Sequence, residues 1–371
     1  MNILHISDVH LGAKFATLGE KGGEQRERLA GVFKKIPQLA ASNNVKLVVI
    51  PGDLFDSPYP ASLQIDVVKS VIDSLLRKGI CVAISAGTHD YLAPGSIYLS
   101  DTLKIDSELL HIFDKPRPSM HIFTRIGVCV SARSLDSNRS HTSPFADLNI
   151  DNKVGVNIAM AHGSVLLPGL KIADDDWPIK LEDIQSSNFS YVALGHWHSM
   201  KEIVKGKAWY CGSPEWVDID QRGSGSVLIV SVEKTGTVVS PISVGSTMFD
   251  KIEIDTGVCL LIETLKNKIL VGANKNLIRK VVLKGIRPKS LVFDVRQLES
   301  ELSSNFLSLT IEDQSVLRVD KSVAQEDTVV GRFVKKMEEK ISSARSENEK
   351  KEIEEAMWIG AKLLKGEEAG L

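Results

Sequence analysis

Residues 46–53 read KLVVIPGD, an apolar run that ends in a proline, a glycine and an aspartate. A short apolar run bounded by turn residues is typical of a strand that is buried on both faces of a sheet. Residues 3–6 and 81–86 have the same character, and helical spacing of apolar side chains predicts helices over 24–43 and 61–77. This alternation of strand and helix predicts an α/β fold built on a parallel sheet covered by helices.

The pattern changes from about residue 105, where short strands are separated by turn residues. These strands predict a mainly β second layer, so that residues 1–255 would form a two-sheet sandwich with helices on both sides. Beyond this boundary we expect a small α+β cap domain over 256–322. Residues 323–371 are polar with two apolar stripes at helical spacing, which predicts a helical tail suited to docking on a partner.

The composition is that of an ordinary globular protein. The chain has 371 residues, 43% of them hydrophobic, and a formal net charge of −2, so no overall basic character favours nucleic acid. The four cysteines show no CxxC spacing and are expected to be reduced. No charged leader precedes the first strand and no apolar run reaches the ~18 residues of a membrane span, so a cytoplasmic protein is expected.

Five short motifs each follow an apolar, strand-like run. They are Asp8-Val9-His10, Gly52-Asp53, Gly87-Thr88-His89-Asp90, His162-Gly163 and Gly195-His196-Trp197-His198. Alone, an Asp-x-His pair is most often a chance surface pair, and a single histidine at a strand end is more often structural than a ligand. However, five of the nine histidines lie in these motifs, and α/β folds carry their sites at the carboxyl ends of parallel strands. The set therefore predicts a two-metal phosphoesterase centre.

These residue types suit the hydrolysis of a phosphoester. Two divalent metals about 3.5–4 Å apart can hold the attacking and leaving oxygens, and one of them lowers the pKa of a water. Mixed imidazole and carboxylate ligands favour Mn, Fe or Zn over Mg or Ca. Asp53 is expected to be shared between the metals. His89 is the candidate to protonate the leaving oxygen, with Asp56 and Asp90 as the carboxylates that could orient it.

The order of the motifs resembles the calcineurin-like metallophosphoesterase family. Three stretches resemble more narrowly the SbcD/Mre-type DNA repair nucleases, namely ISDVHLG at 6–12, GDLFD at 52–56 and YCGSPE at 210–215. The motifs cover residues 1 to about 220, and the domain order resembles that of these nucleases through to the C-terminus. The resemblance implies that the metal is manganese and that His89 is the catalytic acid.

The resemblance also implies a ligand set with one departure. One metal would be held by Asp8, His10, Asp53 and His198, and the other by Asp53, His162 and His196. The family has asparagine at the position of Thr88, where the amide oxygen binds the second metal. A threonine hydroxyl is a shorter and weaker neutral ligand. Either Thr88 replaces the asparagine as a ligand, or the second site binds its metal weakly.

Together these features predict a two-metal-dependent DNA nuclease, an exonuclease that is expected to cut single strands internally as well. By resemblance, its partners are DNA and an SbcC/Rad-type coiled-coil ATPase on which the tail docks. A tail that folds back on its own domain or mediates a homodimer is the alternative. A small-molecule phosphodiesterase or phosphatase would use the same chemistry but needs neither cap nor tail. A DNA-binding scaffold subunit with a weakened metal site is the third hypothesis, and only Thr88 favours it.

A few other residues draw attention without pointing to a ligand. The triplet Asp174-Asp175-Asp176 is expected to be a solvated turn rather than a third cation site. Trp197 is expected to pack rather than to touch a substrate, and His5 to be structural. Four basic residues could line a groove for a phosphate backbone or be scattered over the surface, namely Lys14, Arg26, Arg28 and Arg133.

Overall fold

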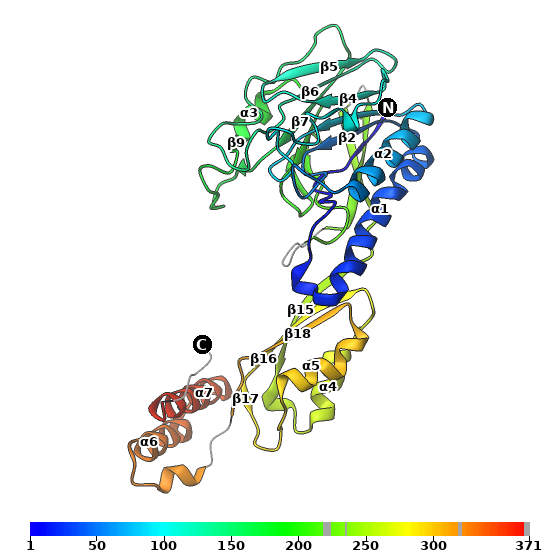
Figure 1. The fold of residues 1–371 in the computed structure, drawn as a ribbon. Coiled ribbons are helices and arrows are strands. Elements are labelled where there is room, and N and C mark those ends of the chain that lie inside the picture. Colours follow the sequence, from blue (N-terminus) through cyan, green and yellow to red (C-terminus); the bar gives the residue numbers. More distant parts are fainter. Residues whose placement is uncertain (218–223, 234–235, 318–320, 367–371) are drawn as a thin grey trace. The chain divides into compact units, whose positions relative to one another are not determined.

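The computed structural model describes the whole chain except residues 218–223, 234–235, 318–320 and 367–371. The chain divides into two compact units, Met1–Thr247 and Met248–Leu371 (Figure 1). No helix among the described residues is both long and apolar enough to cross a membrane.

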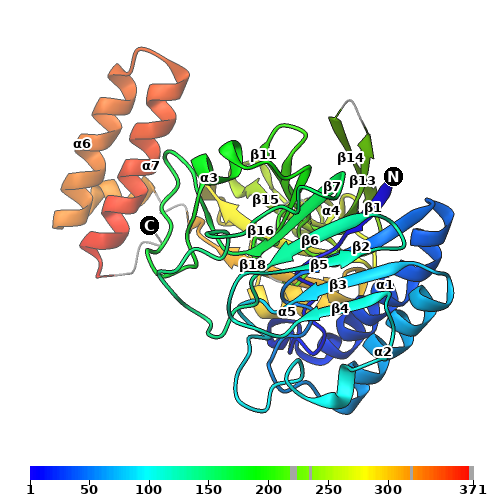
Figure 2. The same ribbon diagram turned by 90° about the horizontal axis from the view of Figure 1, so that it is seen from above.

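The first unit contains a six-stranded sheet with the order β14-β13-β1-β2-β3-β4. Strands β1 to β4 run parallel to one another, as the alternation of strand and helix predicts, and β13 is antiparallel to β1. Helices α1 and α2 pack together and against β2 and β3 (Figure 2). The bounds are β1 Asn2–His5, η1 Ala16–Lys21, α1 Gly22–Ser42, β2 Val45–Pro51, α2 Ser62–Arg77, β3 Cys81–Ser85, η2 Asp101–Leu103, β4 Leu110–Phe113, β13 Ser226–Glu233 and β14 Gly236–Ser243.

A second six-stranded sheet has the order β11-β12-β10-β7-β6-β5, with β6, β7, β10 and β12 parallel. A short helix, α3, and the two-stranded pair β8–β9 accompany it. The bounds are β5 Ser119–Phe123, β6 Val128–Ala132, β7 Val156–His162, β8 Val165–Leu166, β9 Ile179–Lys180, α3 Leu181–Ser186, β10 Tyr191–Gly195, β11 Lys201–Val204 and β12 Ala208–Tyr210.

The main core of the first unit lies between these two sheets. Leu47 and Val49 of β2 belong to one fully buried cluster with Ile158 and Met160 of β7. A second buried cluster joins β7 and β10 to Ile184 of α3. Because the central strands are covered on both faces, their sequences are continuously apolar rather than alternating. The two sheets and their flanking helices confirm the predicted α/β two-sheet sandwich.

The second unit is built on a three-stranded parallel sheet with the order β15-β16-β18. Helices and strands alternate along the chain, and α4 and α5 contribute to a single apolar core. Because β15 pairs with β16 over its whole length, this unit starts at Met248, earlier than the boundary expected at residue 255. The bounds are β15 Met248–Asp255, η3 Thr256–Val258, α4 Ile262–Leu270, β16 Leu277–Lys284, β17 Ile286–Arg287, α5 Val295–Leu302, η4 Ser303–Asn305, β18 Ser308–Asp313, β19 Val316–Leu317 and η5 Lys321–Gln325.

The tail forms two helices, α6 (Val329–Ser343) and α7 (Glu347–Leu364), which pack against each other. Hydroxyl groups cap both N-termini, since Thr328 accepts from the Gly331 amide and Ser346 from the Glu349 amide. Trp358 of α7 is fully buried in a small cluster that also includes partly buried residues of β17 and β19. The tail therefore packs on its own unit through one apolar stripe.

Candidate metal centre

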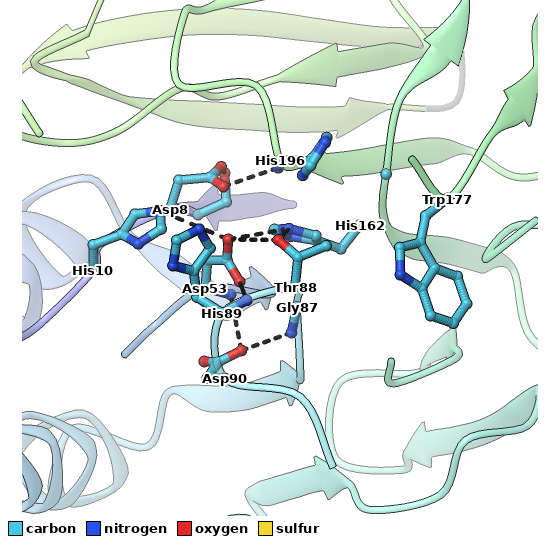
Figure 3. Close-up of polar contacts among 12 residues, drawn as sticks. Asp8, His10, Asp53, Gly87, Thr88, His89, Asp90, His162, Trp177 and His196 are labelled. Atoms are coloured by element: carbon cyan, nitrogen blue, oxygen red, sulfur yellow. Dashed lines mark hydrogen bonds and ion pairs between the residues drawn. The ribbon is translucent and has the colours of Figure 1, made fainter. Parts of the chain in front are cut away.

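The five motifs meet at the carboxyl ends of central strands from both sheets (Figure 3). Residues that follow β1, β2 and β3 come from the first sheet, and residues at the ends of β7 and β10 come from the second. Four of these residues have positive φ angles, namely Asp8, His10, Asp53 and His196. Such angles cost an L-residue energy, and they occur where the surrounding structure holds a functional site in place.

Glycines allow the chain segments of this centre to approach one another closely. A Cβ atom on Gly52 would lie 2.2 Å from His162 Nδ1. A Cβ atom on Gly87 would lie 2.3 Å from Asp53 Oδ1. Both distances are far below any van der Waals contact, so only glycine fits at these two positions.

Asp8, His10 and His198 form the first half of the centre. One possible ligand atom of each lies within 4.8 Å of those of the other two. His10 Nε2 is only 3.0 Å from His198 Nε2. Burial, assisted by the charge of His10, lowers the pKa of His198 to about 4. Two imidazole nitrogens that face each other beside a buried carboxylate are a donor set that fits a divalent cation.

Asp53 lies between this half and the next. Its Oδ2 atom is 3.6 Å from His10 Nε2 and 3.2 Å from His162 Nε2. Burial opposes its ionisation, but the positive charge of His162 and then that of His10 hold the pKa of this carboxyl well below its usual value. Asp53 therefore lies between the imidazoles of His10 and His162, and its role as a carboxylate shared by two metals stays a prediction.

The family resemblance implies that Thr88, His162 and His196 form the second half of the centre. The Thr88 hydroxyl donates to Asp53 Oδ2 at 3.2 Å and lies 3.3 Å from His162 Nε2. His162 Nδ1 is 2.9 Å from the carbonyl oxygen of Pro51. Because a carbonyl only accepts, Nδ1 carries the proton and Nε2 is the nitrogen directed at Asp53. The hydroxyl of Thr88 is thus inside the centre, beside the shared carboxylate.

Asp90 supports the loops that carry the ligands. Its fully buried carboxylate accepts the main-chain amides of Gly87, Asp53 and Phe55 at 2.7, 3.2 and 3.1 Å. It also accepts the Tyr98 hydroxyl at 2.6 Å. Burial raises the pKa of Asp90, and the charge of Asp53 raises it further. With these four partners Asp90 binds main-chain amides and Tyr98, and its role in orienting His89 stays a prediction.

Asp56 is the carboxylate that contacts His89. Its Oδ1 atom is 3.5 Å from His89 Nδ1 and 3.1 Å from His10 Nδ1. The hydrogen bond that His89 donates to the Asp56 carboxylate raises the pKa of His89 despite partial burial. The His89 side chain is 49% exposed, whereas His10 is buried. His89 therefore lies at the open edge of the centre, where the contact with Asp56 favours its protonated form.

Comparison with known proteins agrees with this geometry. Residues 1–200 match the family model for the calcineurin-like phosphoesterases. The chain belongs to this family. Its clusters of histidine and aspartate make the first unit a metallophosphoesterase domain with candidate metal sites.

Among its relatives, the chain is 26% identical over 245 residues to the DNA double-strand break repair protein Mre11 of Methanopyrus kandleri, covering 60% of this chain and 52% of that protein. It is 26% identical over 235 residues to a subunit of the SbcCD nuclease of Staphylococcus epidermidis, covering 57% of this chain and 61% of that protein. It is 24% identical over 222 residues to the uncharacterised metallophosphoesterase YhaO of Bacillus subtilis, covering 55% of this chain and 50% of that protein. The chain thus spans about half the length of the curated relatives it matches.

His196 is held differently from the other histidines of the candidate centre. Among the described residues, three groups of side chains bring possible ligand atoms within 4.8 Å of one another. His196 belongs to none of these groups. Its main-chain amide donates to Asp8 Oδ1 at 2.9 Å, while its ring Nε2 is 3.1 Å from Asp176 Oδ1. Asp176 was expected in a solvated turn and was missed as part of the site. A run of three aspartates contains no signal that one of them turns inward.

The remaining candidate residues bind protein groups. Trp197 stacks on Tyr210 with ring centroids 4.4 Å apart, which confirms its packing role. His5 is fully buried and contacts the Tyr191 hydroxyl at 2.9 Å, as a structural histidine would. The basic residues make local contacts: Arg26 with the Lys14 carbonyl, Arg28 with Glu24, and Arg133 with the Ser143 carbonyl. These contacts are compatible with either expectation for the four basic residues.

Proposed function

We propose that this phosphoesterase is a two-metal-dependent DNA nuclease of DNA repair, an exonuclease that also cuts single strands internally. The observation that carries the proposal is the position of Asp53, a buried carboxylate with imidazole nitrogens on both sides, 3.6 and 3.2 Å away. Two such half-sites around one carboxylate suit in-line displacement at a phosphodiester. The names of the Mre11 and SbcCD relatives support DNA as the substrate.

We assign the ligands as the family resemblance implies, with Thr88 added to the second set. The first ion would be held by Asp8, His10, Asp53 and His198, and the second by Asp53, Thr88, His162 and His196. The mixture of nitrogen and oxygen donors favours manganese over magnesium or calcium. When bound, two such ions supply a water of lowered pKa and neutralise charge on the phosphate.

The residues of the chain itself would prepare the proton transfer. Asp56 contacts His89 at Nδ1, which favours the protonated ring and leaves Nε2 as the proton donor for the leaving oxygen. The half-exposed position of His89 leaves it within reach of a substrate. Asp56 also contacts Nδ1 of His10, which directs His10 Nε2 into the first half.

The simplest test compares substrates under one set of conditions. We expect the full chain with Mn²⁺ to cleave single-stranded, duplex and hairpin DNA faster than bis(p-nitrophenyl) phosphate. Asp53→Asn should abolish both activities, whereas Asp174→Asn, at an exposed carboxylate outside the centre, should keep them. Cleavage of the small diester alone would favour a small-molecule phosphodiesterase or phosphatase. Tight Mn²⁺ binding with no hydrolysis of either would favour a DNA-binding scaffold.

We further propose that the tail docks on an SbcC/Rad-type coiled-coil ATPase, and that the enzyme works in the cytoplasm, where its four buried thiols stay reduced. The proposal for the tail is supported by the exposed apolar side chains Val329, Leu363 and Leu364 of α6 and α7. The second unit, including residues 256–322, would serve as a cap that contacts DNA. A homodimer through the same helices is the alternative.

Substitutions on the surface of α7 test the docking without removing the tail. Leu363→Lys and Leu364→Lys together should abolish co-purification with the coiled-coil ATPase of the same organism. They should leave Mn²⁺-dependent cleavage intact, because both side chains are exposed. Leu170→Lys, at an equally exposed leucine of the first unit, is the control. Retained co-purification, or a loss of self-association only, would contradict the docking proposal.

A further inference from the structure

The contacts of Asp176 tie it to the metal centre from a neighbouring loop. Its Oδ1 atom is 3.1 Å from His196 Nε2, and its Oδ2 atom accepts the Ser164 hydroxyl at 2.5 Å. Ser164 lies just beyond β7, so the carboxylate joins the ends of two neighbouring strands, β7 and β10. Both carboxylate oxygens are therefore used by groups next to the ligand positions.

The Ser164 hydroxyl is itself fixed. It accepts the indole N–H of Trp197 at 2.9 Å while donating to Asp176. The Trp197 ring stacks on Tyr210, whose hydroxyl donates to the Gly163 carbonyl and accepts the Val165 amide. This explains why a tryptophan stands between the two histidines of its motif: it links their loop to Ser164.

The main chain around Asp176 is also held tightly. The Ser164 amide donates to the Asp176 carbonyl at 3.3 Å, and the Ile179 amide donates to the Ser164 carbonyl at 2.8 Å. A Cβ atom on Gly163 would lie 2.2 Å from the Trp177 carbonyl oxygen. The segment therefore lies directly against the end of β7, and Asp176 has little freedom to move away from His196.

The ring nitrogens of His196 then have different roles. A carboxylate accepts, so the Asp176 contact places the proton of a neutral imidazole on Nε2 and leaves the lone pair on Nδ1. His10 and His162 are held in the same manner, through an oxygen at the ring nitrogen turned away from Asp53. In both of those residues Nε2 faces the centre. In His196 the contact with Asp176 uses Nε2, so Nδ1 is the nitrogen that remains to bind a metal.

We infer that Asp176 is a positioning residue that selects the tautomer of His196 and holds its ring so that Nδ1 binds the second metal. The inference rests on the proposed ligand role of His196. An oxygen partner on the outer nitrogen of a ligating histidine fixes the ring and raises its basicity, and loss of such a partner costs about 10–100-fold in metal affinity.

Metal titration of the full chain tests this inference. Calorimetry with Mn²⁺ should show that Asp176→Asn weakens the weaker binding event by about 10–100-fold and leaves the tighter one unchanged. Asp174→Asn is the matched control, because it makes the same substitution two residues away on an exposed side chain. Ser164→Ala keeps the carboxylate but removes one of its partners, and should weaken the same event by roughly two- to tenfold. It also serves as the second variant should Asp176→Asn not fold.

Two further measurements separate positioning from a purely structural role. Thermal unfolding without metal reports the stability of each variant, and ¹⁵N NMR of the histidine rings reports the tautomer of His196. A lower melting temperature with unchanged Mn²⁺ affinity and tautomer would overturn the inference, as would an equal loss of affinity in Asp174→Asn. If His196→Ala loses the weaker Mn²⁺ binding event but Asp176→Asn keeps it, the inference about Asp176 is overturned. The proposed function would be unaffected by that result. If His196→Ala keeps both events, the ligand assignment itself fails.

Discussion

The two halves of the metal centre differ in how far their ligand atoms have already converged. In the first half, Asp8, His10 and His198 bring two ring nitrogens to 3.0 Å of each other beside a carboxylate. In the second, Thr88 offers a neutral hydroxyl, and the ring of His196 is held by Asp176 outside the converging groups. Both halves share Asp53. Under the proposed assignment, one site would be assembled by imidazoles and carboxylates alone, while the other would also depend on the Thr88 hydroxyl and on a histidine held by Asp176.

Asp53→Asn should have the largest effect, because the proposed assignment makes Asp53 the carboxylate common to both halves. We expect both Mn²⁺ binding events to be lost or severely weakened, and hydrolysis to fall to background. Calorimetry and cleavage of bis(p-nitrophenyl) phosphate measure the two results. A variant that loses a single binding event would show that Asp53 belongs to one half only.

His89→Ala should reduce the rate of hydrolysis by about 10²–10⁴-fold while leaving both binding events nearly unchanged. The reason is that His89 Nδ1 contacts Asp56 at the open edge of the centre, with half of its side chain exposed. Single-turnover kinetics and Mn²⁺ titration on the same preparation provide the check. Loss of metal from this variant would make His89 a ligand and contradict the role of proton donor.

Thr88→Asn should tighten the weaker binding event and leave the tighter one as it was. An amide oxygen reaches farther than the Thr88 hydroxyl, which already lies 3.3 Å from His162 Nε2. The Mn²⁺ concentration needed for half-maximal hydrolysis should fall in parallel. Two equally tight Mn²⁺ binding events in the unsubstituted protein would contradict a difference in affinity between the two halves. Unchanged Mn²⁺ affinity in Thr88→Asn would contradict it as well.

Tyr98→Phe should have the smallest effect on chemistry. It removes a 2.6 Å hydrogen bond to the buried carboxylate of Asp90, and leaving that carboxylate with one partner fewer should cost about 1–3 kcal/mol of unfolding free energy. Asp90 keeps its three main-chain amides, so both metal events should persist. Denaturant unfolding measures the cost. A selective loss of one event would mean that Asp90 supports one half more than the other.

The sequence was sufficient to place the residues that follow central strands. Asp8, Asp53 and His162 each come directly after an apolar run, and the carboxyl ends of those runs meet at one edge. The role of Asp176 could not be predicted in this way. Its contact with His196 depends on how a loop of irregular structure folds over Gly163, and a carboxylate beside two others resembles a solvated turn.

The start of the second unit was also hidden in the sequence. β15 reads MFDKIEID, in which polar and apolar residues alternate only from Lys251 to Asp255, so it is compatible with an edge strand of either unit. Its assignment follows from pairing with β16, which begins 22 residues after β15 ends at Asp255 and is thus a long-range contact. Local pattern identifies such a strand, but only its partner decides the unit to which it belongs.

The glycines at the centre have a consequence for any survey of its tolerance to substitution. Gly52 and Gly87 donate no ligand atom, yet even an alanine there would place a methyl group 2.2 Å from His162 Nδ1 or 2.3 Å from Asp53 Oδ1. Gly52 also has a φ of 90°, which side chains rarely accept. Alanine scanning normally deletes side-chain atoms. At these two glycines it would add a methyl group and displace the side chain of His162 or Asp53. They should rank with the aspartates and histidines in such a survey, although they have no chemistry of their own.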